Sequence, residues 1–257
     1  MRFGPLALLA IIFAFVSLPI GGQQATTKDP LAISLLQKSV AAMAIVAPTD
    51  SSATGSINIV EGSSNETGTI QILTLGTNQT AENITLPNTQ RSVVYSNGLA
   101  KEVDGTLSTN AVMELSVADL CSDFPLPLLM DALNNSDEVF QYIGQETLSG
   151  ESVQHVRIWN SFASNPRLQR IAPFSAKDIW LDSVSILPVK IAYNRRAGGG
   201  AVPSIPVEVF FSNYTNVNGV QYPFQINKSY NGTPWQTITI QSVAFNTGLT
   251  SSSFQVQ

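Results

Sequence analysis

The sequence predicts a mainly β protein with some helix: a strongly curved antiparallel sheet with helices covering its concave face. Three observations support this prediction. Most of the chain alternates between apolar and polar residues, which is typical of half-buried strands. Asn-Gly pairs at 97–98 and 218–219 separate apolar runs, a strong signal for β-hairpins. After the N-terminal region, helical periodicity occurs only at 29–43 and 110–134. The rest of the chain is a series of hairpins, and a sheet made of so many hairpins is expected to curve around its apolar face.

The first residues have the layout of a secretory signal peptide. Arg2 precedes an apolar core from about Leu6 to Leu18, and Pro19 and two glycines follow. The apolar stretch is shorter than the ~20 residues of a membrane span. We therefore expect a signal peptide at 1–22, a single domain at 23–257, and a periplasmic or secreted location. No cysteine near the cleavage region offers the thiol of a bacterial lipoprotein.

Composition excludes several classes of function. Charged residues make up 12% of the chain and the net charge is −5, without the basic patch of a nucleic-acid binder. One cysteine, Cys121, and one histidine, His155, can form neither an internal disulfide nor a zinc site. We expect no cofactor and no metal, and we read Cys121 as a small buried hydrophobe.

Catalysis ranks below binding. His155 sits beside Arg157 in an alternating strand, and no G-x-S-x-G elbow accompanies it. Paired carboxylates for glycoside hydrolysis stay open, because several acids lie on or near strands: Glu146, Glu151, Asp178, Asp182 and Glu208. Each also fits a turn or a solvent-facing position, and we expect a protein that is not an enzyme.

The N-terminal half of the domain predicts one helix and a meander. Asp29 is a good N-cap and Pro30 suits the first helical position, so a helix is expected over 29–43, with Leu31, Leu35, Leu36 and Met43 on one face. Strands follow around 57–59, 68–75, 82–87 and 91–96, and a hairpin turns at 97–98. Residues 110–134 then predict a helical insertion, either a lid or ordinary core.

The C-terminal half predicts further hairpins. Residues 139–160 turn at Ser149-Gly150, with Val156 and Ile158 on one face and His155 on the other. Residues 161–176 are expected to be a loop. The segment 195–200 is expected to be a hairpin tip with solvated arginines, and strands are expected over 205–230 and 235–246.

Residues 177–193, "KDIWLDSVSILPVKIAY", are interpreted as one hairpin. Ile179 and Leu181 face one side of the first strand and Trp180 faces the other. Asp182 begins the turn, where its carboxylate can accept hydrogen bonds from backbone amides ahead of it. Pro188 suits the start of the return strand. The aspartate is therefore interpreted as a turn residue and not as an active-site acid.

Three segments carry a resemblance to a known family. They are W-L-D with a polar turn and L-P-V-K at 180–190, the closing strand that ends at Asn246, and the series Phe211, Tyr214, Val217, Gly219, Val220 and Pro223. With the order of helix, meander, helical interruption and hairpins, the chain resembles the outer-membrane lipoprotein carrier superfamily, the LolA/LolB-type proteins, and above all its lipoprotein-sorting members. The resemblance covers most of the mature chain and is clearest from 139 to 246.

The resemblance implies an unclosed half-barrel with helices in its concave mouth, apolar ligands held between sheet and helices, and no catalysis. We expect a secreted or periplasmic protein that holds a lipid-like or lipoprotein acyl ligand in an apolar cavity. The alternative is a periplasmic sensor or protein-interaction module without lipid cargo. Expected partners are a lipid or an acylated protein, together with a membrane-associated protein, and the chain is expected to be monomeric.

Six residues are candidates for the cavity and its lid. Lid candidates come from the helical insertion, where methionine adapts to irregular ligands: Met113, Leu129, Met130 and Leu133. Trp180 and Phe210 are candidates for the cavity wall. For each of them, plain core packing is the alternative. Arg91 is a candidate for a lid-holding arginine by its place in the first meander alone.

Overall fold

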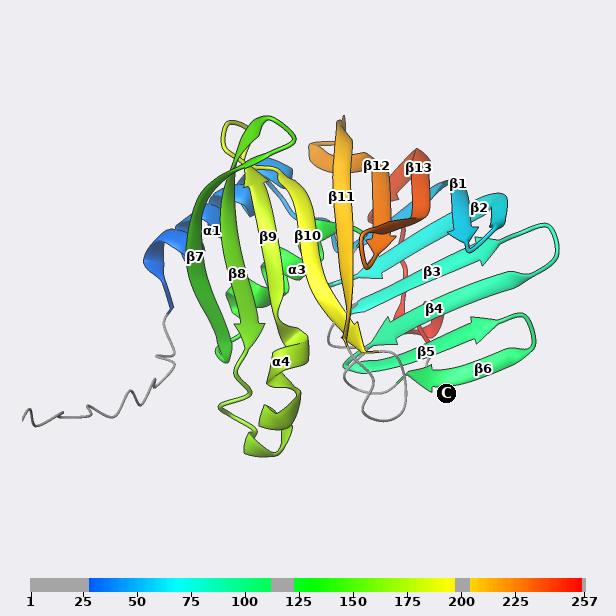
Figure 1. The fold of residues 1–257 in the computed structure, drawn as a ribbon, viewed down its shortest axis with the longest axis horizontal. Helices are drawn as coiled ribbons and strands as arrows, with labels where there is room; N and C mark the ends of the chain where they lie inside the picture. Colours follow the sequence, from blue (N-terminus) through cyan, green and yellow to red (C-terminus); the bar gives the residue numbers. More distant parts are fainter. Residues whose placement is uncertain (1–27, 112–122, 197–203, 256–257) are drawn as a thin grey trace, which may run out of the picture.

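The computed structural model describes residues 28–111, 123–196 and 204–255. They form a 13-stranded antiparallel sheet in the order β6-β5-β4-β3-β2-β1-β13-β12-β11-β10-β9-β8-β7 (Figure 1). The chain builds one meander from the centre outward, then a second meander from the other edge back to the centre. The sheet is not closed, because β6 and β7 stand at its two ends. The expected curved, mainly β architecture is confirmed.

The elements have the following bounds. The first meander is β1 (Asp50–Glu61), β2 (Ser64–Leu75), β3 (Gln79–Thr85), β4 (Gln90–Ser96), β5 (Leu99–Asp104) and β6 (Leu107–Ala111). The second is β7 (Glu138–Leu148), β8 (Glu151–Asn160), β9 (Lys177–Asp182), β10 (Pro188–Arg196), β11 (Ser204–Val217), β12 (Val220–Tyr230) and β13 (Thr233–Phe245). The helices are α1 (Pro30–Met43), α3 (Pro125–Asn134) and α4 (Ala172–Ser175), with 3₁₀ turns η1 (Pro166–Ile171) and η2 (Ser251–Ser253).

The turns follow the predicted chemistry. Asn97-Gly98 and Asn218-Gly219 both have positive φ at the two central positions, 51° and 82° in the first pair and 51° and 88° in the second. This backbone matches the twist of the flanking strands in two-residue hairpins. Asp182 also behaves as predicted, since its Oδ1 accepts hydrogen bonds from the amides of Val184 at 3.2 Å and Ser185 at 2.6 Å.

The sheet curls until distant strands face one another. Arg195 of β10 forms an ion pair with Glu102 of β5, and Lys228 of β12 lies 3.5 Å from Glu82 of β3. The expectation that Arg195 is solvated is therefore wrong, because the curvature brings it an acid from the other meander. In Figure 1, strands β3–β6 run roughly horizontally, whereas strands β7–β11 run roughly vertically.

The two faces of the sheet differ in cover. Ile179 and Leu181 are fully buried in one continuous core with residues of α1 and α3, which lie behind β7–β10 in Figure 1. The segment expected to be a loop at 161–176 contains η1 and α4 instead, and α4 packs against β8 and β10. Within the described ranges, no helix is long and apolar enough to span a bilayer.

Helix α1 begins as its sequence predicts. Asp29 is the N-cap and accepts from the amides of Leu31 at 2.9 Å and Ala32 at 3.4 Å. Leu35, Leu36 and Met43 are buried, but Leu31 is half exposed and does not share their face. Ala32 in the first turn is fully buried in the core, so the buried face of the helix passes beside Leu31 and does not include it.

Candidate functional site beneath helix α3

The inner face of the second meander carries a large part of the continuous apolar core. Each strand contributes alternate side chains to it, as the period of two requires. The set that is 3% exposed or less includes Val156, Ile158, Ile179, Leu181, Ile191, Val207, Val209, Phe211, Tyr222, Ile226 and Ile238. Helices α1 and α3 cover this face, and they are attached to it in different ways.

Helix α1 is fixed to the sheet through its backbone at both ends. At its start, Lys28 forms a parallel bridge with Phe140, and the Asp29 amide donates to the Phe140 carbonyl at 3.2 Å. Asp29 Oδ2 accepts from the amide of Tyr142 at 3.0 Å, and this bond is the main reason that the pKa of Asp29 is lowered. Just after its end, Ala44 forms an antiparallel bridge with Val220.

Helix α3 is held by side chains. It packs against α1. Its N-cap, Phe124, makes no side-chain capping bond. The helix is apolar on nearly every side, because Leu126, Leu128, Leu129 and Ala132 are buried, as are both of its prolines. Such a helix needs cover all round, which the sheet and α1 supply only while α3 stays docked.

An aromatic contact joins the start of α3 to the sheet. The ring of Phe124 stacks on that of Tyr222 in β12, with centroids 4.5 Å apart, and Phe245 of β13 lies 6.4 Å from Phe124. The Tyr222 hydroxyl is buried and makes no hydrogen bond with any residue in the described ranges. Its burial, together with the nearby carboxylates of Asp123 and Glu82, raises the pKa of Tyr222.

A buried ion pair lies beside this contact. Lys228 Nζ of β12 is 2.6 Å from Asp123 Oδ1, and the two side chains are 6% and 3% exposed. Burial acts to lower the pKa of Lys228, but Asp123 and Glu82 outweigh it and raise that pKa. Asp123 precedes α3 by two residues, so the pair fastens the segment that leads into the helix. Removing one partner would leave a buried charge uncompensated.

A second group of charges lies at the far end of α3. Asp131 of α3 accepts a hydrogen bond from Thr77 in the β2–β3 turn at 3.0 Å. Burial raises the pKa of Asp131 and raises that of Glu138, at the start of β7, to about 7; Lys177 opposes both shifts. These residues line a small hollow of about 160 Å³ against α3. The helix is therefore latched at one end by Asp123 and at the other by Asp131.

Solved structures share the fold of this chain, although no family model and no curated protein matches the sequence. A domain from Vibrio parahaemolyticus assigned to the outer membrane lipoprotein-sorting proteins has a TM-score of 0.59 at 12% identity, over 87% of this chain and 96% of that one. A LolA superfamily protein from Nitrosomonas europaea has a TM-score of 0.58 at 13% identity, over 88% and 97%. A DUF1329 family protein from Desulfovibrio piger has a TM-score of 0.56 at 12% identity, over 87% and 97%. The chain has the fold of the LolA superfamily.

The LolA-like fold implied by the sequence resemblance is thus confirmed. Of the residues proposed for its lid, Leu129 is fully buried in α3, and Met130 and Leu133 pack half-buried against the same core. These three therefore lie in the helix that covers the inner face. Met113 lies outside the described residues. Arg91 bonds Glu61 at 2.6 Å and Asp104 at 3.3 Å, which ties β4 to its own meander and not to α3.

Trp180 and Phe210 lie on the other face of the LolA-like sheet. Both pair in register with Lys190, whose Nζ sits 4.5 Å from the centre of the Trp180 ring and 5.2 Å from that of Phe210. Their neighbours in sequence, Ile179 and Val209, are the ones that face the helices. We expected Trp180 and Phe210 to line the cavity wall, and this expectation is corrected. The alternation of residues along a strand predicts that the strand has two faces, but it does not predict which face the helices cover.

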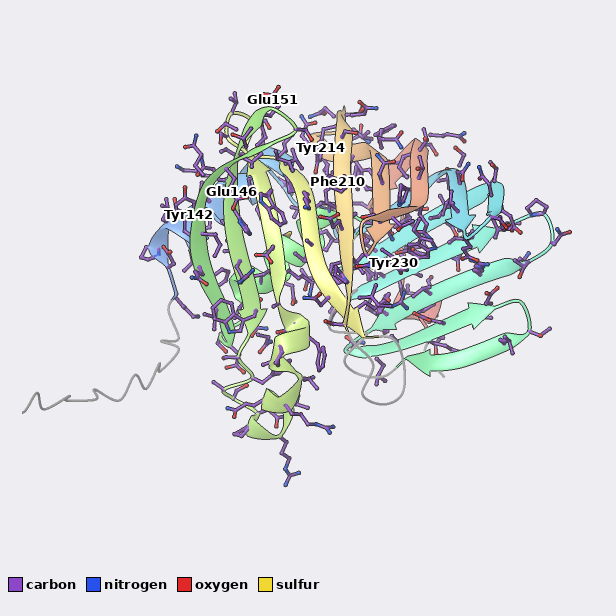
Figure 2. All side chains as sticks on the ribbon, in the orientation of Figure 1. Tyr142, Glu146, Glu151, Phe210, Tyr214 and Tyr230 are labelled. Atoms are coloured by element: carbon purple, nitrogen blue, oxygen red, sulfur yellow. The ribbon has the colours of Figure 1, made fainter. Side chains whose placement is uncertain are left out.

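His155 belongs to the same outer face. Its Nδ1 lies 2.6 Å from Glu146 Oε1, its Nε2 lies 2.8 Å from Asp178 Oδ1, and its ring stacks on Trp180 at 4.2 Å. Both ring nitrogens thus face carboxylates, which leaves neither free to activate a hydroxyl or thiol. Hydrogen bonds from Trp180 and His155 lower the pKa of Glu146. Figure 2 labels Glu146 of β7 and Phe210 of β11, the strands on either side of β8, β9 and β10.

Sequence reasoning missed the polar residues that hold α3. Asp123 with Lys228, and Asp131 with Thr77, are pairs of residues from distant segments, and no local motif predicts either pairing. One signal was available, because a lysine inside an alternating apolar strand such as β12 needs a buried partner. The identity of that partner depends on the curvature of the sheet.

Proposed function

We propose that this chain is a non-catalytic binding protein that takes up an acyl chain or a similar apolar ligand on the inner face, in exchange for helix α3. The observation that carries the proposal is the difference between the two covering helices. Backbone bonds anchor α1 at both ends, whereas α3 is held by apolar packing and by two side-chain latches. An apolar ligand can replace the packing that α3 supplies.

The energetics support an exchange. The hollow beside α3 holds about 160 Å³, and Asp131, Glu138 and Lys177 are among its lining residues, so α3 is packed closely against the inner face. If α3 swings away, the apolar inner face needs new cover. Each methylene of an acyl chain that becomes buried contributes about 0.8 kcal/mol. A long chain can therefore offset the loss of α3 from the core.

The similarity of fold supports this proposal. One of the similar structures is described as a lipoprotein-sorting protein domain, and another as a LolA superfamily protein. We infer from the N-terminal pattern that the site operates in the periplasm or after secretion. N-terminal sequencing of the exported protein tests this location, with a mature end at or near residue 23 as the expected result.

A disulfide lock tests the exchange. Thr77→Cys with Asp131→Cys, in a Cys121→Ser background, replaces the 3.0 Å hydrogen bond between the β2–β3 turn and α3 by a covalent bond. The control is Thr54→Cys with Ser242→Cys, a directly paired position of β1 and β13 whose hydroxyls lie 2.8 Å apart. Binding of dansyl-undecanoic acid is measured for both proteins, oxidised and reduced.

We expect the oxidised lock to bind at least tenfold more weakly than its reduced form, while the control binds equally in both states. Lipid extraction of the purified wild-type protein, followed by mass spectrometry, should also recover acyl chains. Equal binding by the oxidised lock would show that α3 is not exchanged. No probe binding and no co-purified lipid would remove the acyl ligand from consideration.

A second candidate function follows from the packed state itself. The inner face already holds α3, a ten-residue apolar helix, so it is shaped to accept a helix from another protein. A sensor or interaction module without lipid cargo would use the groove in this way. In the lock experiment, this alternative predicts that the wild type binds no acyl probe.

A further inference from the structure

A larger hollow lies on the opposite face of the sheet, between strands β7–β11 and the segment η1–α4. It encloses about 720 Å³, within the range of ~300–1,000 Å³ typical of small-molecule sites. Its floor is a row across three strands, because Ala192 of β10 pairs in register with Asp178 of β9 and Glu208 of β11. The small side chain of Ala192 leaves space between two carboxylates.

The charges around this floor are balanced. Arg157 donates from Nε and Nη2 to the two oxygens of Asp178 at 2.8 and 2.9 Å. Glu208 forms an ion pair with Lys190 at 2.5 Å. A ligand with a net charge would meet no uncompensated partner here, so the hollow favours a neutral molecule.

The walls offer groups that both donate and accept hydrogen bonds. The side-chain amides of Gln141, Gln169 and Asn194 line the hollow, and they make no hydrogen bond with any residue in the described ranges. Trp159 supplies a half-buried aromatic surface beside them. Hydroxyl groups match such amides and carboxylates, and the C–H face of a sugar ring matches an aromatic plane.

We propose that this hollow binds a neutral oligosaccharide, with one sugar ring packed on Trp159 and its hydroxyls bonded to Asp178, Glu208 and the three amides. The site lies on the face away from α3. It does not depend on the proposed acyl binding, and the disulfide lock of α3 should leave it unchanged.

Titration calorimetry and tryptophan fluorescence with maltotriose, cellotriose and chitotriose test the site. The chain has three tryptophans, and Trp235, which stacks on Tyr230 at 4.1 Å, serves as the matched control. We expect at least one trisaccharide to bind, with affinity at least tenfold weaker in Trp159→Ala and unchanged in Trp235→Phe. Ala192→Met should weaken binding equally, because it fills the floor without removing any contact.

Three results would overturn the proposal: no response to any of the three sugars, binding that survives both Trp159→Ala and Ala192→Met, or stronger binding of the anionic trigalacturonate than of every neutral sugar. If Trp159→Ala does not fold, Ala192→Met decides alone, since its backbone pairing stays intact and its folding is checked by circular dichroism.

Discussion

Arg195 of β10 pairs with Glu102 of β5, although β4, β3, β2, β1, β13, β12 and β11 lie between them in the sheet. Arg195 also donates to the Tyr230 hydroxyl at 2.8 Å. A flat sheet would place these two strands far apart, given the ~4.8 Å spacing of neighbouring strands. The pair therefore reports strong curvature and joins the two meanders across the concave face.

The first prediction concerns this pair. Arg195→Gln and Glu102→Gln should each lower the free energy of unfolding by about 1–2 kcal/mol, because the side chains are only partly exposed and one charge would lose its partner. Urea denaturation of both single variants and the double variant measures the coupling. We expect the free energy of unfolding of the double variant to fall by at least 0.5 kcal/mol less than the sum of the two single-variant losses. If the losses are fully additive, the pair does not stabilise the curvature of the sheet.

The second prediction concerns pH. Burial raises the pKa of Glu138 from 4.5 to about 7, so the folded chain binds its proton more tightly than the unfolded chain does. Its contribution to stability is therefore present below about pH 4.5 and is lost as pH rises through about 7. The whole change is about 3 kcal/mol at most. Thermal unfolding from pH 4 to 8 should show this decline.

Glu138→Gln should flatten this pH dependence, because the amide does not ionise. Glu151→Gln, on an exposed residue of the β7–β8 hairpin, is the control and should leave the pH profile unchanged. An unaltered profile for Glu138→Gln would assign the pH dependence to other groups.

The third prediction concerns the two covering helices. Backbone bonds tie α1 to β7 and β12, whereas α3 has no backbone bond to a strand among the residues that the structure describes. We therefore expect α3 to open at a lower free energy than α1. Hydrogen exchange followed by mass spectrometry should show faster exchange in 126–134 than in 31–43. Asp131→Ala removes one latch and should accelerate α3 alone. Equal rates in the two helices would contradict the lid.

The fourth prediction concerns Asp182. Hydrogen bonds from the backbone and side chain of Ser185 and from the amide of Val184 lower its pKa below 3.8. Asp182→Ala should therefore reduce stability by about 1–2 kcal/mol at neutral pH, and the difference should shrink as pH falls below 3.8. Binding of acyl probe or sugar should not change. Loss of binding at unchanged stability would mean that Asp182 is functional and not a turn residue.

Local features were predictable from the sequence. Helix α1, the Asn-Gly hairpins and the separation of Ile158 from His155 follow from caps, turn chemistry and alternation, which act over a few residues. The partners of Arg195 and Lys228 were not predictable, because they depend on how far the whole sheet bends. Trp180 shows the same limit at the site: its strand was identified correctly, but the covered face depends on where α1 and α3 dock.

The pairing of β1 with β13 has a consequence for how the chain reaches its native state. Ser51 pairs with Phe245, so the central seam joins the beginning of the domain to its end. Each meander can form from neighbouring hairpins, but the seam must wait until synthesis has delivered the last strand. Contacts of such long sequence separation slow folding. Until then, both halves expose unpaired edges, and the growing chain is at its most vulnerable to aggregation and proteolysis.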